Sequence, residues 1–150
     1  MTGPFTGLRI LDFSRDKSGK YATMIMSDMG AEVIRVDHPK EEVSFDPEDR
    51  FLNRGKKSVT LNRESKEGSS FLKTLVKSSD LLIHTWLAKK AKSAFMDYES
   101  ISDINESLIY CSIPPYGDSG PMADIPGDEG TVAAFTGIHE GQGGETGTPL

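Results

Sequence analysis

The sequence predicts an α/β protein with a Rossmann-like, doubly wound, mostly parallel sheet that carries helices on both faces. Short runs of apolar and β-branched residues alternate with stretches whose apolar residues recur at helical spacing. The connections between these runs are long enough for right-handed crossovers between parallel strands. The run at 81–83 is apolar throughout, as expected for a strand covered on both faces. A length of 150 residues fits one compact domain.

The first strand–helix–strand unit is expected within residues 8–37. Residues 8–13 form a short apolar strand, and the polar stretch 14–20 reads as a loop. From Tyr21 onward, apolar residues recur at helical spacing until Gly30, which is a typical helix stop. The second strand covers 32–37 and is closed by the following His-Pro pair.

The second half of the sheet follows the same order. Residues 57–61 predict a third strand, and 71–76 carry the inner face of the helix after it. Residues 81–83 form the fourth strand. Two short helical stretches follow, at 88–95 and from Tyr98, with Asp97 placed to cap the second one.

The last predicted elements are a strand at 108–113 and a helix at 131–136. A loop dense in turn residues, 114–121, separates them, and residues 127–130 open the helix. The chain ends in the glycine-rich stretch 137–150. Ligands of a doubly wound sheet bind where loops leave the carboxyl ends of its strands, so these loops are the candidate binding regions.

Charge and composition exclude several classes of protein. The formal net charge is −6, with 23 acidic and 17 basic side chains, which argues against a nucleic-acid partner. No stretch is apolar enough for a membrane span and the first residues lack the pattern of a signal peptide, so a cytoplasmic location is expected. Cys111 is the single cysteine and reads as a buried structural thiol.

Common cofactor and metal motifs are missing from the candidate loops. A dinucleotide fingerprint needs three close glycines, whereas the loop after the first strand offers only Gly19, and no Walker motif is complete. The three histidines, His38, His84 and His139, show no metal-ligand spacing, so no metal site is predicted. Asp37 stands where such folds place a ribose-binding carboxylate, which keeps a nicotinamide-binding domain as a weaker alternative.

Several segments, taken in order, resemble one family. They are GLRILDFS (7–14), DMGAEVIRV (28–36), NRGKKSVTL (53–61), LIYCSI (108–113) and YGDSGP (116–121). Together they are similar to the opening of class III CoA-transferases, the group that includes formyl-CoA transferase, carnitine CoA-transferase and methylacyl-CoA racemase. The resemblance implies a Rossmann-like N-terminal domain, here 1–150, which holds the nucleotide end of coenzyme A and is a fragment of a longer chain.

The same resemblance implies the partners of the full-length protein. Coenzyme A enters as a thioester substrate, with no tightly bound cofactor, and the partners are acyl-CoA and carboxylic acid substrates. The full-length subunit is expected to interlock with a second copy as a homodimer. The fragment alone is expected to be inactive, with its glycine-rich end serving as an active-site loop.

The family's contacts to coenzyme A fall on residues that follow four strands. The matching positions are Lys17, Ser18, His38, Leu61, Thr85 and Trp86. The family commonly has Asn-Phe in place of Thr85-Trp86, and Trp86 is expected to stack on adenine. Lys89 and Lys90 are close enough in sequence to contact phosphates, although a solvated helix face explains these lysines equally well.

The family's catalytic acid falls on Glu129, where the transferases usually have aspartate. That aspartate attacks the acyl-CoA thioester and passes through anhydride and enzyme-CoA thioester intermediates. Glu129 has the same functional group on a longer arm, and Asp128 directly precedes it in place of the racemases' histidine, which weighs against racemase chemistry.

Two alternatives to a catalytic acid remain open. Adjacent carboxylates commonly cap the N-terminus of a helix, and Asp128 and Glu129 are placed to do so. The second alternative concerns the whole chain: it is a noncatalytic CoA-binding or scaffold half of a tandem CoA-transferase-like protein instead of a CoA-transferase with an acidic nucleophile.

Overall fold

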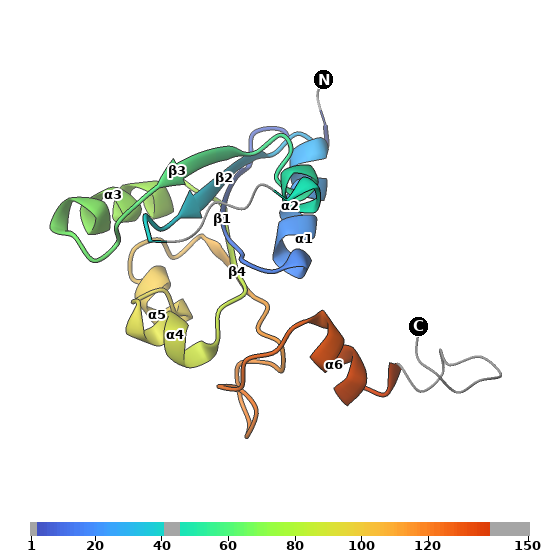
Figure 1. Cartoon of the computed structure of the whole chain (residues 1–150). Helices are drawn as coiled ribbons and strands as arrows, with labels where there is room; N and C mark the ends of the chain where they lie inside the picture. The colour runs from blue at the N-terminus through green and yellow to red at the C-terminus, as the bar shows by residue number, and fades with distance from the viewer. Residues whose placement is uncertain (1–2, 41–45, 139–150) are drawn as a thin grey trace.

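The computed structural model describes residues 3–40 and 46–138 and contains a five-stranded, fully parallel sheet (Figure 1). The strand order is β3-β2-β1-β4-β5. The strands are β1 (Arg9–Phe13), β2 (Glu32–Asp37), β3 (Lys57–Thr60), β4 (Leu81–His84) and β5 (Ile109–Ser112). All five lie within the predicted runs or extend them by one residue, so the predicted α/β class is confirmed.

Within the described residues, six helices connect or follow these strands. They are α1 (Lys17–Asp28), α2 (Pro47–Leu52), α3 (Lys66–Lys77), α4 (Ala88–Ser93), α5 (Tyr98–Ser102) and α6 (Glu129–Phe135). Asp97 caps α5 as predicted, because its Oδ1 accepts a hydrogen bond from the Ser100 amide at 3.3 Å. Helix α2 was not predicted; it begins with proline at its first position and is capped by Asp46.

The prediction that residues 14–20 form a loop is wrong from Lys17 onward. Helix α1 begins at Lys17, with Asp16 at its N-cap position, four residues before the expected start. The first turn of α1 contains no large apolar residue, and burial instead comes from Gly19 packing closely against the sheet. Lys17 and Ser18 therefore lie on a helix end and not in a loop.

Helices cover both faces of the sheet and enclose two cores. On one face, α3 and α5 pack with strand residues around a large cluster that includes Phe13, Leu82 and Met96. On the other face, α1 covers a smaller cluster that includes Ile10, Val33 and Ile83. Figure 1 shows α1 and α2 on one side of the sheet and α3, α4 and α5 on the other. Successive residues of a strand point to opposite faces of the sheet, so alternate strand residues contribute to the two cores.

Two further expectations concern the burial of the cysteine and membrane-spanning segments. Cys111 is only partly buried; it packs at the margin of the smaller core, and burial raises the pKa of its thiol. Within the described ranges, no helix is long and apolar enough to cross a membrane.

The strand order creates a switch point between β1 and β4. From β1 the chain first builds outward through β2 to β3, and then returns to the other side of β1 to add β4 and β5. The connections leave the carboxyl ends of β1 and β4 in opposite directions, and doubly wound sheets bind their ligands at such a point. The segments that follow Phe13 and His84 lie at this edge.

Candidate active site at the carboxyl edge of the sheet

The segment between β1 and α1 is fastened to the segment after β4. The backbone amide of Arg15 donates a hydrogen bond to the Thr85 side-chain oxygen at 3.0 Å, and its guanidinium donates to the Val36 carbonyl at 2.8 Å. A Cβ atom at Gly19 would overlap the Ser14 side chain and come within 2.9 Å of Thr85 Cγ2. Only glycine therefore fits at position 19, because the first turn of α1 approaches both segments this closely.

Lys17 and Ser18 occupy the exposed first turn of α1. Lys17 Nζ lies 2.9 Å from a carboxylate oxygen of Glu48 on α2, and the Ser18 hydroxyl donates to Asp16. The pKa of Lys17 is raised, chiefly by its hydrogen bond and ion pair with Glu48 and further by the nearby carboxylates of Glu129 and Asp46. The charge of the Glu129 carboxylate thus favours the charged form of Lys17.

Trp86, one of the predicted contacts, belongs to the large core. Its ring is 3% exposed and packs edge-on against Phe13 at a centroid distance of 5.7 Å. The Arg63 guanidinium lies 4.4 Å from the Trp86 ring centroid, and Lys90 Nζ lies at 5.2 Å. In this conformation the side chains of Arg63 and Lys90 lie over the Trp86 ring. Stacking of adenine on Trp86 therefore stays a prediction, and it requires one of these two side chains to move away from the ring.

The remaining predicted contacts lie along the same edge. His38 follows β2, where its Nδ1 accepts from the Lys40 amide at 3.2 Å, and buried Leu61 follows β3, where its amide donates to the Asp37 carbonyl at 2.8 Å. Lys89 is exposed at the start of α4, and its amide donates to the Asp124 carboxylate at 3.3 Å. The structure thus brings the predicted residues from four strand ends to one edge of the sheet.

A hydrogen-bonded histidine fixes the segment that carries Thr85 and Trp86. The Tyr110 hydroxyl donates to the Met96 carbonyl at 2.8 Å and lies 2.6 Å from His84 Nε2, while His84 Nδ1 accepts from the Trp86 amide at 3.1 Å. These partners assign the neutral tautomer with the proton on Nε2. Burial lowers the pKa of His84, which keeps the ring neutral.

Asp37 is committed to ion pairs. Its carboxylate lies 2.7 Å from Nη2 of Arg35 and 3.7 Å from Nη1 of Arg15. A ribose-binding carboxylate needs its oxygens available to accept from hydroxyl groups. The geometry of Asp37 therefore gives little support to the nicotinamide alternative. Across the part of the chain that the structure describes, no three His, Cys, Asp or Glu side chains gather into a possible metal site.

The two candidate acids have different surroundings. Asp128 is the N-cap of α6: its Oδ1 accepts from the Thr131 amide at 2.8 Å, and the Thr131 hydroxyl accepts from the Asp128 amide at 2.8 Å. These hydrogen bonds lower the pKa of Asp128. Glu129 is the first helical residue and is exposed, so its carboxylate is not used by this reciprocal cap. The capping expectation thus holds for Asp128.

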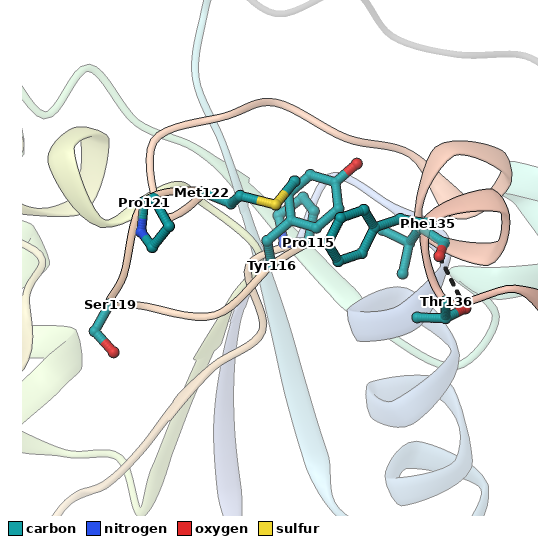
Figure 2. Close-up of a pocket in the computed structure, with 8 residues that line it drawn as sticks. Pro115, Tyr116, Ser119, Pro121, Met122, Phe135 and Thr136 are labelled. Carbon is teal, nitrogen blue, oxygen red and sulfur yellow. Dashed lines mark hydrogen bonds between the residues drawn. The ribbon is translucent and has the colours of Figure 1, made fainter.

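A hollow of about 320 Å³ lies where the loop after β5 meets α6 (Figure 2). Tyr116 and Phe135 form its aromatic wall, with ring centroids 5.6 Å apart, and Met122 lies along the same wall. A Cβ atom at Gly127 would come within 2.8 Å of the Tyr116 ring, so the chain turns tightly around this ring before α6 begins. Loop and ring together fix where Glu129 starts its helix.

Comparison with known proteins identifies the family. The family model described as CoA-transferase family III matches residues 5–150. The chain belongs to CoA-transferase family III. This family III chain is 34% identical to succinyl-CoA:glutarate CoA-transferase of Mus musculus and 30% identical to succinate–glutarate CoA-transferase of Agrobacterium fabrum, in each case over 98% of its length.

Solved structures agree with that assignment. The crystal structure of Rv3272 from Mycobacterium tuberculosis superposes with a TM-score of 0.85 at 28% identity, and covers 99% of this family III chain and 45% of the Rv3272 chain. The chain spans 36% of the length of the mouse relative and 41% of that of the Agrobacterium relative. The shared fold therefore corresponds to less than half of each relative.

Several residues of this edge were not found from the sequence. Arg63 lies three positions after the end of β3 and over the Trp86 ring. Arg15 lies two positions after the end of β1 and links the ends of β1, β2 and β4. Both are arginines just beyond a predicted strand end, which was the available signal. Lys56, which forms a buried ion pair with Asp12, gave no such signal, because a lysine in a loop normally reads as a surface residue.

Proposed function

We propose that this chain supplies the coenzyme A site and the acidic nucleophile of a CoA-transferase that moves coenzyme A between carboxylic acids. One observation supports the proposal most strongly: residues that follow four strands lie at the carboxyl edge of the sheet, and the charge of the exposed Glu129 carboxylate raises the pKa of Lys17 at that edge. Family membership supports the reaction class, and this arrangement supports the roles that we propose for the residues.

The nucleotide end of coenzyme A fits the chemistry of this edge. Exposed cations stand at the starts of two helices: Lys17 on α1, and Lys89 and Lys90 on α4. Their positive charges would attract phosphate groups, and the N-terminus of the 12-residue helix α1 also favours an anion. The proposed contacts also include Ser18, His38, Leu61, Thr85 and Trp86. Coenzyme A binds here as part of the thioester substrate, and no tightly bound cofactor takes part.

Glu129 is the proposed nucleophile because Asp128 is already used by the cap. The Glu129 carboxylate attacks the acyl-CoA carbonyl, forming a mixed anhydride and releasing the CoA thiolate. The thiolate then attacks the Glu129 carbonyl, which gives a glutamyl-CoA thioester and releases the first carboxylate. The acceptor carboxylate attacks this thioester, which forms a second mixed anhydride and releases the CoA thiolate again. The thiolate then attacks the acceptor's carbonyl in this anhydride, which gives the new acyl-CoA and regenerates the free Glu129 carboxylate.

The same proposal extends to the whole protein. Its substrates are an acyl-CoA and a carboxylic acid, and its active form is an interlocked homodimer in the cytoplasm. The alternative is a noncatalytic CoA-binding or scaffold half of a tandem protein. It shares the coenzyme A site and differs only in the role of Glu129, so binding and chemistry are tested separately.

Binding is tested by titration with coenzyme A. Trp86 is the only tryptophan of the chain and is one of the proposed contacts, so its fluorescence should change as coenzyme A binds. We expect saturation in the micromolar range for coenzyme A and a Lys17→Ala variant that binds about fivefold more weakly, as for the loss of one exposed phosphate contact. Lys66→Ala, at the start of α3, is the matched control and should bind as the wild type does.

Two outcomes of the titration contradict the coenzyme A site. One is the absence of saturable coenzyme A binding at millimolar concentrations. The other is tighter binding of NAD than of coenzyme A, which would favour the nicotinamide alternative in spite of the ion pairs of Asp37.

A further inference from the structure

A buried ion pair lies directly beneath the candidate site. Lys56 Nζ is 2.9 Å from Asp12 Oδ2, and the two side chains are 1% and 0% exposed. Lys56 precedes β3, whereas Asp12 lies near the carboxyl end of β1. A buried pair is costly unless hydrogen bonds satisfy all of its polar atoms, so its surroundings show what it holds in place.

The pair is fully hydrogen-bonded. Besides Asp12, Lys56 Nζ donates to Thr23 Oγ1 at 2.7 Å and to the Lys20 carbonyl at 3.0 Å, which uses all three ammonium protons. The Thr23 hydroxyl lies 2.6 Å from Asp12 Oδ2. Burial lowers the pKa of Lys56, and the charge of Asp12 opposes that shift.

The contacts of this network end on the segment that forms the site. The other oxygen of Asp12 accepts from the Ser14 amide at 2.9 Å, which fixes the first residue after β1. Lys20 and Thr23 lie in the first two turns of α1, so Lys56 holds the start of that helix against the sheet. Between these two anchors lie residues 14–19, which include Lys17 and Ser18 and approach Thr85.

We propose that Asp12, Lys56 and Thr23 are positioning residues that hold the start of α1 in the geometry that binds coenzyme A. The proposal rests on the proposed coenzyme A site. None of the three touches the substrate; they act through Ser14 and the first turns of α1. A buried salt bridge is a weak source of stability compared with apolar packing, so this one is better explained by the position that it imposes.

The test separates positioning from stability with a double variant, Asp12→Val/Lys56→Met. It removes both charges together, leaves side chains suited to a strand and a core, and lets Thr23 donate to the Gly19 carbonyl, which is already 2.9 Å away. The Ser14 amide loses its acceptor, and the Lys20 carbonyl loses one of its donors. The control is Arg9→Met/Glu32→Gln, which removes an ion pair between β1 and β2 at the amino ends of these strands, away from the candidate site.

Three quantities are measured for each variant: the thermal unfolding midpoint, the Kd for coenzyme A and the hydrogen-exchange rates of the amides at 14–18. We expect the double variant to keep its cooperative unfolding transition, to bind coenzyme A at least tenfold more weakly, and to exchange these amides faster while those of β4 stay protected. A tenfold rise in Kd corresponds to about 1.4 kcal/mol of binding free energy. The control should match the wild type in binding and in exchange at 14–18.

An unchanged Kd together with unchanged exchange at 14–18, in a folded double variant, would overturn the proposal. If the double variant does not fold, Thr23→Val is measured instead, because it removes one hydroxyl without changing the shape of the side chain. Faster exchange at 14–18 and a roughly threefold rise in Kd would support positioning. No change in either quantity would refute it. If the wild type itself does not bind coenzyme A, the proposed site fails, and the exchange rates alone still show whether the network positions the segment.

Discussion

Replacing Glu129 with glutamine is expected to abolish CoA transfer by the full-length protein, with a loss in kcat of about 10⁴-fold or more. The amide keeps the size of the side chain but cannot attack the thioester, and removal of a covalent nucleophile has effects of this order or larger. Glu129 is exposed and outside both cores, so the variant should fold normally. Initial rates with an acyl-CoA donor and a carboxylate acceptor measure the loss.

Two companion variants separate nucleophile from cap. Asp128→Asn keeps an oxygen for the Thr131 amide, so it should retain transfer activity within about a few-fold and keep its unfolding midpoint close to that of the wild type. Glu129→Asp keeps the carboxylate on a shorter arm and should retain measurable transfer, at a cost of up to about a hundredfold. Full activity of Glu129→Gln, or a greater loss in Asp128→Asn, would reverse the assignment.

Phe13→Ala is expected to lower the free energy of unfolding by about 3–5 kcal/mol, the range measured for large aromatic side chains removed from cores. Phe13 is 0% exposed and lies in the large core at the end of β1. Its loss opens a cavity beneath Trp86 and removes their edge-to-face contact, which adds to the burial term. Urea unfolding measures the change.

Phe71→Ala is the matched control for this deletion. Phe71 lies on α3 and is 46% exposed, so the same truncation should cost less than about 1.5 kcal/mol. Trp86 emission should shift in Phe13→Ala and stay unchanged in Phe71→Ala. Equal losses of stability in the two variants would contradict the description of the core.

The sheet was predictable because its strands are short, apolar and separated by helical patterns. The start of α1 was not, because Lys17–Asp28 opens with polar residues and its burial depends on Gly19 fitting against Ser14 and Thr85. Helix α2 was missed because six residues with few apolar side chains carry almost no periodic signal. In both cases long-range packing decided the structure.

The site was predictable only where a family motif marks it. The burial of Trp86 and the two cations over its ring do not follow from the residues next to it in the sequence, because Arg63 and Lys90 belong to different segments. The Asp12–Lys56 pair joins positions 44 residues apart, and nothing in the sequence distinguishes this lysine from a solvated one. The difference between Asp128 and Glu129 likewise required the cap geometry. The roles given to the predicted contacts stay predictions.

The most direct test of the central claim, that Glu129 is the nucleophile, is to trap the covalent intermediate. The full-length protein is incubated with acyl-CoA, treated with hydroxylamine, and its peptides are analysed by mass spectrometry. A thioester on the side chain would be converted to a hydroxamate, and we predict that modification on Glu129, dependent on acyl-CoA. A hydroxamate on Asp128, or an unmodified peptide from a protein that turns over acyl-CoA, would contradict the account.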